Sequence, residues 1–218
     1  MSHDFWEDPE RVEQFAEREP DDLVERYDHP SSVRVLDLGC AGGRNTVLLA
    51  RRGFDVQALD ASAAMVERAR ERVATIMGPE AATERVRPGR MDDLSRYGDG
   101  AFELVVALGV YHAAATRDEW ERAVDETARI LKAGGLLLFN QFTPEVDLTG
   151  RGVRAVPGEP GVYDGSPAGR AVLLDADALD AAWSERGLTP DVPSETVRVE
   201  LERGRRVSVN ALYRKVGA

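Results

Sequence analysis

The chain has 218 residues, 43% of them hydrophobic, and a formal net charge of −11, which suits one globular domain with a sizeable core. The acidic balance argues against a nucleic-acid partner, because binding to a phosphate backbone relies on clustered Lys and Arg. No apolar run reaches the roughly 18 residues of a membrane span, and the acidic N-terminal stretch lacks the apolar core of a secretory signal. The single cysteine, Cys40, excludes an internal disulfide and favours a reducing, cytoplasmic location.

Residues 1–32 are predicted to form one or two short amphipathic helices. Phe5, Trp6 and Phe15 belong to an apolar stripe, and the Asp and Glu residues between them are expected to face water. Pro30 and the serine after it close the segment. This segment is expected either to form a lid over a site or to be a helix that covers the edge of a sheet.

From residue 33 onward, short apolar runs alternate with helical patterns. The expected strands are Val33–Leu38, Phe54–Leu59, Arg85–Pro88, Phe102–Ala107 and Leu136–Phe142, and the expected helices are Asn45–Arg52, Ala63–Ile76 and Arg117–Leu131. The third helix begins with the capping-box pattern Thr116-x-x-Glu119 and is expected to carry Lys132 at its end. Continuous apolar strands separated by helices are typical of a parallel sheet with helices on both faces.

The remainder of the chain has a different pattern. Residues 144–170 are rich in Gly and Pro and are predicted to be an insert, either one wall of a site or a surface loop. A short helix is expected over Asp175–Arg186, followed by strands Thr196–Leu201 and Arg206–Leu212 that form an antiparallel hairpin. The predicted fold is therefore α/β and doubly wound, with a mostly parallel seven-stranded sheet and a C-terminal antiparallel hairpin over residues 33–218.

A glycine-rich turn follows the first expected strand. Asp37 and Gly39 lie where the strand ends, which is where open parallel sheets bind their ligands. The glycines allow a sharp turn and a close approach of the backbone to a ligand, and a helix that begins near Asn45 points its N–H groups at the same place. A dinucleotide site would need G-x-G-x-x-G, and this pattern fails because positions 41 and 44 are Ala41 and Arg44.

Acidic residues follow three successive strands and favour a cationic ligand without phosphates, S-adenosylmethionine. Asp37 is placed to meet the amino group of such a ligand, and Asp60 is placed to accept both ribose hydroxyls. Asp60 alone does not distinguish the ligand classes, because dinucleotide enzymes also carry an acid after the second strand. Asp92 is placed to accept the adenine amino group, with the polarizable Met91 packed against the ring.

With these motifs the chain resembles the class I S-adenosylmethionine-dependent methyltransferases. The matching segments are Val35–Asn45, Val56–Ala61, Arg90–Leu94, Phe102–His112 and Leu131–Phe142, in the order that the family has them. The resemblance implies that Gly39, Ala41, Gly42, Asp60, Met91, Asp92 and Leu108 bind the cofactor, although Ala41 stands where the family usually has glycine. Within the family, Arg44-Asn45 and the C-terminal strand pair are most similar to the tellurite-resistance-type small-molecule methyltransferases.

Eleven residues are therefore predicted to form the cofactor site: Asp37, Gly39, Cys40, Ala41, Gly42, Asn45, Asp60, Ala61, Met91, Asp92 and Leu108. His112 and Tyr111 are the catalytic candidates, because they follow the fourth strand, where the methyl group is expected to emerge. His112 is interpreted either as a general base or substrate contact, or as a packed side chain. No metal site is predicted.

The predicted function is methyl transfer from S-adenosylmethionine to a small-molecule acceptor by direct displacement. Alignment of a nucleophile with an electrophilic methyl group can lower a barrier by about 7–11 kcal/mol, so a dedicated acid or base is not required. Two alternatives stay open: a non-catalytic protein that binds S-adenosylmethionine or a nucleoside, and a nicotinamide-dependent oxidoreductase. No nucleic-acid or membrane partner is expected, and the sequence identifies neither the acceptor nor the oligomeric state.

Overall fold

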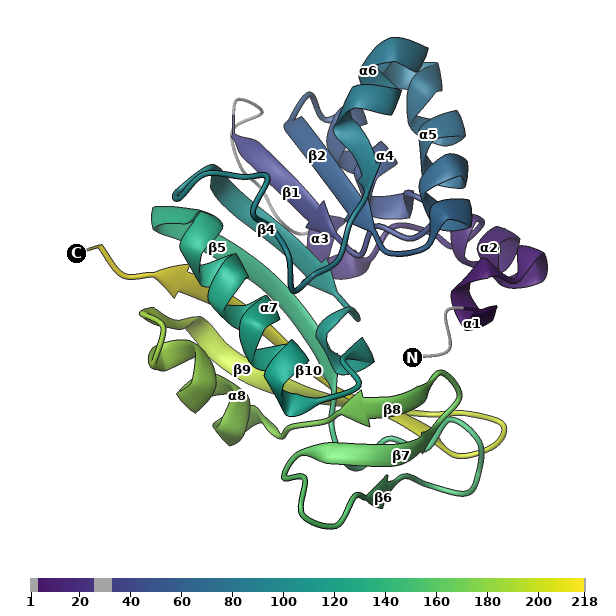
Figure 1. Cartoon of the computed structure of the whole chain (residues 1–218), viewed down its shortest axis with the longest axis vertical. Coiled ribbons are helices and arrows are strands. Elements are labelled where there is room, and N and C mark those ends of the chain that lie inside the picture. Colours follow the sequence, from purple (N-terminus) through teal and green to yellow (C-terminus); the bar gives the residue numbers. More distant parts are fainter. Residues whose placement is uncertain (1–3, 26–32, 218) are drawn as a thin grey trace.

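The structure is a computed structural model that describes residues 4–25 and 33–217. Its centre is a seven-stranded sheet with the strand order β3-β2-β1-β4-β5-β10-β9 (Figure 1). The first five strands are parallel, and β10 runs antiparallel to both of its neighbours, β5 and β9. These strands are β1 (Arg34–Leu38), β2 (Asp55–Asp60), β3 (Val86–Pro88), β4 (Phe102–Leu108), β5 (Leu131–Phe142), β9 (Leu188–Glu200) and β10 (Arg205–Lys215). The doubly wound α/β fold with its C-terminal antiparallel hairpin is confirmed.

Helices cover both faces of the sheet. They are α1 (Asp4–Glu7), α2 (Pro9–Ala16), α3 (Asp22–Glu25), α4 (Arg44–Arg51), α5 (Ala63–Met77), α6 (Pro79–Arg85), the 3₁₀ turn η1 (Tyr111–Ala113), α7 (Arg117–Ile130) and α8 (Ala176–Ser184). Successive side chains of a strand point to opposite faces. Val35 accordingly packs in the core that includes Leu49 of α4, whereas Leu36 packs in the core that includes Trp120 of α7. Both faces of β1 are therefore buried, as its continuous apolar run predicts.

The helix ends follow the predicted caps, with one correction. The hydroxyl of Thr116 accepts a 3.2 Å hydrogen bond from the N–H of Glu119, as the capping-box pattern predicts. The helix ends at Ile130, however, and Leu131 is already extended (ψ 136°). Lys132 therefore belongs to β5, and its predicted place in the last helical turn is wrong.

The insert at residues 144–170 is more regular than its Gly and Pro content indicates. It contains most of a separate three-stranded antiparallel sheet of β6 (Arg154–Ala155), β7 (Val162–Ser166) and β8 (Gly169–Val172). Gln141 at the end of β5 anchors this small sheet, because its side-chain amide donates a 3.2 Å hydrogen bond to the carbonyl of Val172. Figure 1 places the small sheet beyond the ends of β4 and β5.

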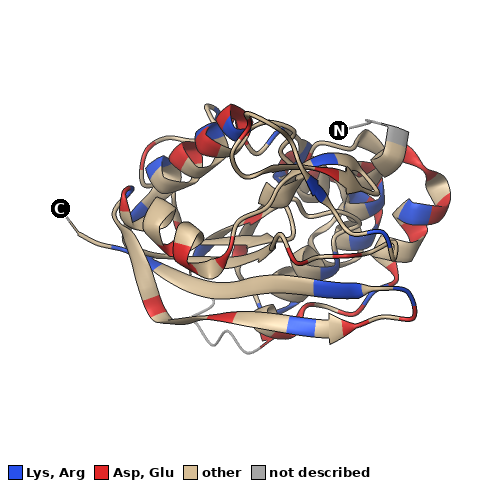
Figure 2. Ribbon diagram, turned by 90° about the horizontal axis from the view of Figure 1, so that it is seen from below, with Lys and Arg blue, Asp and Glu red and all other residues tan. Residues whose placement is uncertain are grey.

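The C-terminal hairpin is longer than predicted. The predicted strand Thr196–Leu201 is the second half of β9, whose first half contains Pro190 and Pro193. Proline is tolerated on an edge strand, where its missing N–H need not pair, and β9 is the edge of the sheet. Figure 2 shows Lys and Arg residues interspersed with Asp and Glu residues over this hairpin and the helices. That the protein has no nucleic-acid partner stays a prediction. No helix within the described residues is long and apolar enough to cross a membrane.

Candidate cofactor site

A cavity of about 310 Å³ lies at the carboxyl ends of β1, β2, β3 and β4. Its lining residues are Trp6, Glu7, Phe15, Leu38, Gly39, Cys40, Ala41, Arg44, Asn45, Asp60, Ala61, Ser62, Met65, Gly89, Arg90, Met91, Asp92, Leu108, Gly109, Val110, Ala113 and Glu119. This is the edge of an open parallel sheet at which ligands bind, and the volume falls in the range of roughly 300–1,000 Å³ that small-molecule sites occupy.

The turn after β1 is tight and needs its glycines. Gly39 has φ +72°, and a Cβ atom there would lie 2.8 Å from side-chain carbons of Val110. A Cβ atom at Gly42 would lie 2.6 Å from the Cβ of Ala16 in α2. Gly39 therefore leaves room for Val110 beside the cavity, whereas Gly42 makes room for the N-terminal helices and does not line the cavity.

Asp60 fixes the floor of the cavity. One carboxylate oxygen accepts a 2.8 Å hydrogen bond from the N–H of Ala41, and the other accepts a 2.9 Å bond from the N–H of Ser62. Burial raises the pKa of Asp60 above its usual value, although these hydrogen bonds oppose the shift. Each carboxylate oxygen has a second acceptor position, so Asp60 can still accept hydrogen bonds from a ligand.

Asp37 lies behind the cavity rather than on its surface. Asp37 shares a sheet face with Val35, which packs under α4, and its carboxylate accepts a 2.5 Å hydrogen bond from the hydroxyl of Thr46. Burial raises the pKa of Asp37 to about 6, although the bond from Thr46 opposes the shift. Asp37 does not line the cavity, and its contact with the amino group of a ligand stays a prediction.

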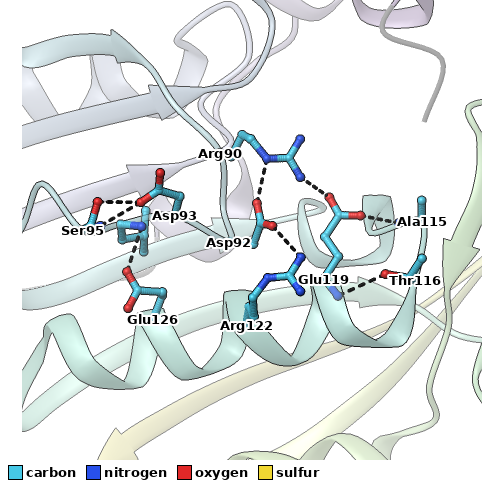
Figure 3. Close-up of polar contacts among 10 residues, drawn as sticks. Arg90, Asp92, Asp93, Ser95, Ala115, Thr116, Glu119, Arg122 and Glu126 are labelled. Atoms are coloured by element: carbon cyan, nitrogen blue, oxygen red, sulfur yellow. Dashed lines mark hydrogen bonds and ion pairs between the residues drawn. The ribbon is translucent and has the colours of Figure 1, made fainter.

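Asp92 lies at the rim with both oxygens occupied (Figure 3). Arg90 donates to one oxygen at 2.9 Å and Arg122 of α7 donates to the other at 3.1 Å. A second nitrogen of Arg90 donates to Glu119 at 2.8 Å, so the rim is joined to the start of α7. Met91, which stands between Arg90 and Asp92 in the sequence, is 8% exposed.

The two catalytic candidates lie outside this cavity. Tyr111 is fully buried, stacks on Phe139 and forms a 2.7 Å hydrogen bond with the hydroxyl of Thr127. His112 faces the insert instead, where its ring stacks on Phe142 with centroids 4.2 Å apart. Its Nδ1 is buried without a hydrogen-bond partner among the described residues. Burial lowers the pKa of His112 to about 4, so the ring is neutral at pH 7.

The N-terminal helices form one wall of the cavity. Trp6 and Phe15 line it and pack edge-to-face with ring centroids 5.3 Å apart. The carboxylate of Glu7 accepts hydrogen bonds from the first two N–H groups of α5, and the hydroxyl of Ser62 donates a 3.0 Å bond to the carbonyl of Trp6. The side-chain oxygen of Asn45 accepts a 2.9 Å hydrogen bond from the N–H of Asp21. Pro30 and Ser31 lie outside the described residues.

Most of the predicted cofactor residues therefore meet in one cavity. The predicted residues that line it are Gly39, Cys40, Ala41, Asn45, Asp60, Ala61, Met91, Asp92 and Leu108, and those that do not are Asp37 and Gly42. Cys40 is buried, which raises the pKa of its thiol, so it is a poor nucleophile. No group of three or more His, Cys, Asp or Glu side chains that could hold a metal occurs in residues 4–25 and 33–217.

Four charged residues that line the cavity were not predicted to bind a cofactor: Glu7, Arg44, Arg90 and Glu119. Arg44 donates a 3.2 Å hydrogen bond to the carbonyl of Glu19, so the N-terminal segment fixes its side chain. The capping-box pattern in the sequence indicated that the side chain of Glu119 points back toward the start of α7. Its carboxylate reaches back to the N–H of Ala115 at 2.8 Å, and the same group faces the cavity.

Comparison with known proteins finds similar methyltransferases. A family model described as a methyltransferase domain matches residues 35–135, the segment that contributes most of the cavity. The methyltransferase GfsG of Streptomyces halstedii is 32% identical over 142 residues, which are 63% of this chain and 49% of that protein. A ubiquinone biosynthesis O-methyltransferase of Caulobacter sp. (strain K31) is 33% identical over 106 residues, 49% of this chain and 39% of that protein.

Over residues 35–135 the chain is similar to S-adenosylmethionine-dependent methyltransferases. A solved S-adenosylmethionine-dependent methyltransferase of Methanosarcina mazei has the same fold, with a TM-score of 0.71 at 17% identity over 92% of this chain and 100% of that one. The chain spans less than half the length of the two curated relatives, 49% and 39%. None of the relatives named here is of the tellurite-resistance type, so that finer assignment stays a prediction.

Proposed function

We propose that this protein transfers the methyl group of S-adenosylmethionine to a small-molecule acceptor by direct displacement. The observation that carries the proposal is the meeting of Asp60, Asp92 and the glycine turn in one cavity at adjacent strand ends. Cytoplasmic location is part of the same proposal, on the grounds of the lone cysteine.

The charges of the lining fit a cationic cofactor with an amino-acid tail. Four carboxylates line the cavity, those of Glu7, Asp60, Asp92 and Glu119, against the two guanidinium groups of Arg44 and Arg90. Asp60 would hold the ribose hydroxyls and Asp92 the adenine amino group. The backbone at Gly39, together with Arg44, would hold the tail, whose carboxylate matches a guanidinium.

The residues on the acceptor side are apolar. When bound, S-adenosylmethionine supplies an electrophilic methyl group. The end of β4 and the segment after it bring no acid or base to the cavity, because the residues that line it there are Leu108, Gly109, Val110 and Ala113. The contribution of this wall is to exclude water and to align the acceptor, which in favourable cases lowers a barrier by about 7–11 kcal/mol. His112 lies behind this wall and remains the candidate for contact with an acceptor that enters from the side of the insert.

The N-terminal segment would act as a lid. Trp6 and Phe15 cover the cavity, and the contacts of Glu7 and Ser62 join α1 to the start of α5. Trp6 also offers a readout, because the other two tryptophans, Trp120 and Trp183, are fully buried elsewhere. Titration with S-adenosylhomocysteine is expected to change the fluorescence of the wild type and to leave that of Trp6→Phe unchanged.

Two measurements test the proposal. Calorimetry should show binding of S-adenosylmethionine and S-adenosylhomocysteine and none of NAD, whereas preference for NAD would reinstate the oxidoreductase alternative. A panel of phenols, amines and thiols is then screened for release of S-adenosylhomocysteine, phenols first because one relative is named as an O-methyltransferase. Binding without turnover of any acceptor would favour a non-catalytic binding protein.

A further inference from the structure

The loop that carries Asp92 is bound to one face of α7 along a regular seam. Three interactions form this seam: Arg90 to Glu119 at 2.8 Å, Asp92 to Arg122 at 3.1 Å, and the N–H of Leu94 to Glu126 at 2.9 Å (Figure 3). The loop contributes every second residue to the seam: Arg90, Asp92 and Leu94. The helix contributes Glu119, Arg122 and Glu126, which have the i, i+3, i+7 spacing of one helix face.

The loop turns at Asp92, where the N–H of Asp93 donates a 3.3 Å hydrogen bond to the carbonyl of Arg90. This turn presents Arg90 and Asp92 to α7 beside each other. Within the seam, Asp92 is held from two sides, because Arg90 of its own loop and Arg122 of α7 each donate to a different oxygen.

The seam also sets the charge state of Asp92. Burial would raise the pKa of this carboxyl, but the hydrogen bonds from Arg90 and Arg122 outweigh burial and hold the pKa below its usual value. The side chain of Asp92 is 8% exposed, whereas that of Arg122 is 57% exposed. Arg122 does not line the cavity, so it makes no direct contact with a ligand there.

We propose that Arg122 is a positioning residue that orients the Asp92 carboxylate for recognition of the adenine amino group. The proposal rests on the proposed function, because it requires an adenosyl cofactor in the cavity. Arg122 holds one oxygen of Asp92 and so stops rotation of the carboxylate, which leaves the remaining acceptor positions fixed at the rim. A fixed acceptor loses less conformational freedom on binding than a rotating one.

The test compares two ligands that differ at the group that Asp92 would recognise. S-Inosylhomocysteine carries a carbonyl oxygen where S-adenosylhomocysteine carries the amino group. Calorimetry gives the ratio of the two dissociation constants for each protein. The wild type is expected to prefer S-adenosylhomocysteine by roughly tenfold or more, since a hydrogen bond to a charged group is lost with the analogue. Arg122→Gln is expected to lower this preference by roughly fivefold, a typical size for coupled neighbours.

Arg117→Gln is the matched control. Arg117 is on the same helix and pairs with Glu121 at 2.6 Å, without contact to Asp92. Its substitution should shift the melting temperature about as much as Arg122→Gln and leave the preference unchanged. Asp92→Asn should abolish the preference, and the double variant Asp92→Asn/Arg122→Gln should show no further loss.

Failure of this proposal and failure of the proposed function give different results. An unchanged preference in Arg122→Gln, or a further loss in the double variant, would overturn the proposal and reduce the seam to an ion-pair network that stabilises the fold. A wild type that binds both ligands equally would also overturn it, because Asp92 would then not recognise the amino group. If S-adenosylhomocysteine does not bind the wild type at all, the proposed function itself fails.

Discussion

The backbone N–H of Ala41 donates a 2.8 Å hydrogen bond to the carboxylate of Asp60, which joins the turn after β1 to the end of β2. Ala41 has φ 47° and is the only non-glycine residue with positive φ among the described residues. The same carboxylate holds the N–H of Ser62 at 2.9 Å. One acid therefore holds the turn and the start of α5 in place and also lines the cavity.

Ala41→Gly should stabilise the protein slightly. The left-handed conformation costs a non-glycine residue about 1–2 kcal/mol, and glycine offsets about 0.4–1 kcal/mol of this gain by its greater freedom in the unfolded chain. We expect the free energy of unfolding to rise by about 0.5 kcal/mol, measured by urea denaturation. Ala74→Gly, within α5, is the control and should lower stability by about 1 kcal/mol. Equal losses in both variants would show that Ala41 is not strained.

Asp60→Ala should weaken binding of S-adenosylhomocysteine by about 1–3 kcal/mol, because hydrogen-bonding groups of the ligand would lose their acceptor. It should also lower stability, since the N–H groups of Ala41 and Ser62 lose theirs. Asp55→Ala is the matched control, because Asp55 lies at the other end of β2 and pairs with Arg34 and Arg85. Calorimetry on both variants separates the effects, and equal affinity in the folded Asp60 variant would argue against the ribose assignment.

Asp37→Asn should remove a pH dependence of stability. The pKa of Asp37 is raised to about 6 in the folded state, above its usual value of 3.8, so the folded state binds the proton more tightly. The contribution of Asp37 to stability is therefore present at low pH and is lost as the pH rises through 6. Relative to the wild type, Asp37→Asn should gain about 1.4 kcal/mol between pH 5 and pH 7.5, at 1.36 kcal/mol for each pH unit. A constant difference between the two proteins would contradict the raised pKa.

His112→Phe should remove a pH dependence of opposite sign. The pKa of His112 is lowered to about 4 in the folded state, so the unfolded chain binds the proton more tightly below pH 6.5. The wild type should lose up to about 2 kcal/mol from this group between pH 6.5 and pH 5, and His112→Phe, which keeps the stack on Phe142, should not. Denaturation at the two pH values measures both proteins. A normal rate of methyl transfer by the variant at every pH would remove His112 from the catalytic candidates.

Much of the fold could be predicted from hydrophobic patterning, because β1, β4 and β5 are buried on both faces and read as continuous apolar runs. Elements without such a run were missed. In α6, Ala82 is the only buried residue, so its sequence shows no apolar stripe. The strands β7 and β8 are hidden among glycines, and the first half of β9 is hidden by Pro190 and Pro193.

The sequence by itself determined which residue types lie at the carboxyl ends of the parallel strands. The apolar runs place an acid at the end of β2, another after β3 and the glycine turn after β1 at one edge of the sheet, since parallel strands end together. Only the tertiary structure decided which side chains face the cavity. Asp37 and Leu38 are neighbours on a strand with two buried faces, so nothing in the sequence shows that Asp37 lies under α4 while Leu38 lines the site. Arg122 likewise reaches Asp92 across 30 residues of chain, a contact made by helix packing rather than by any local pattern.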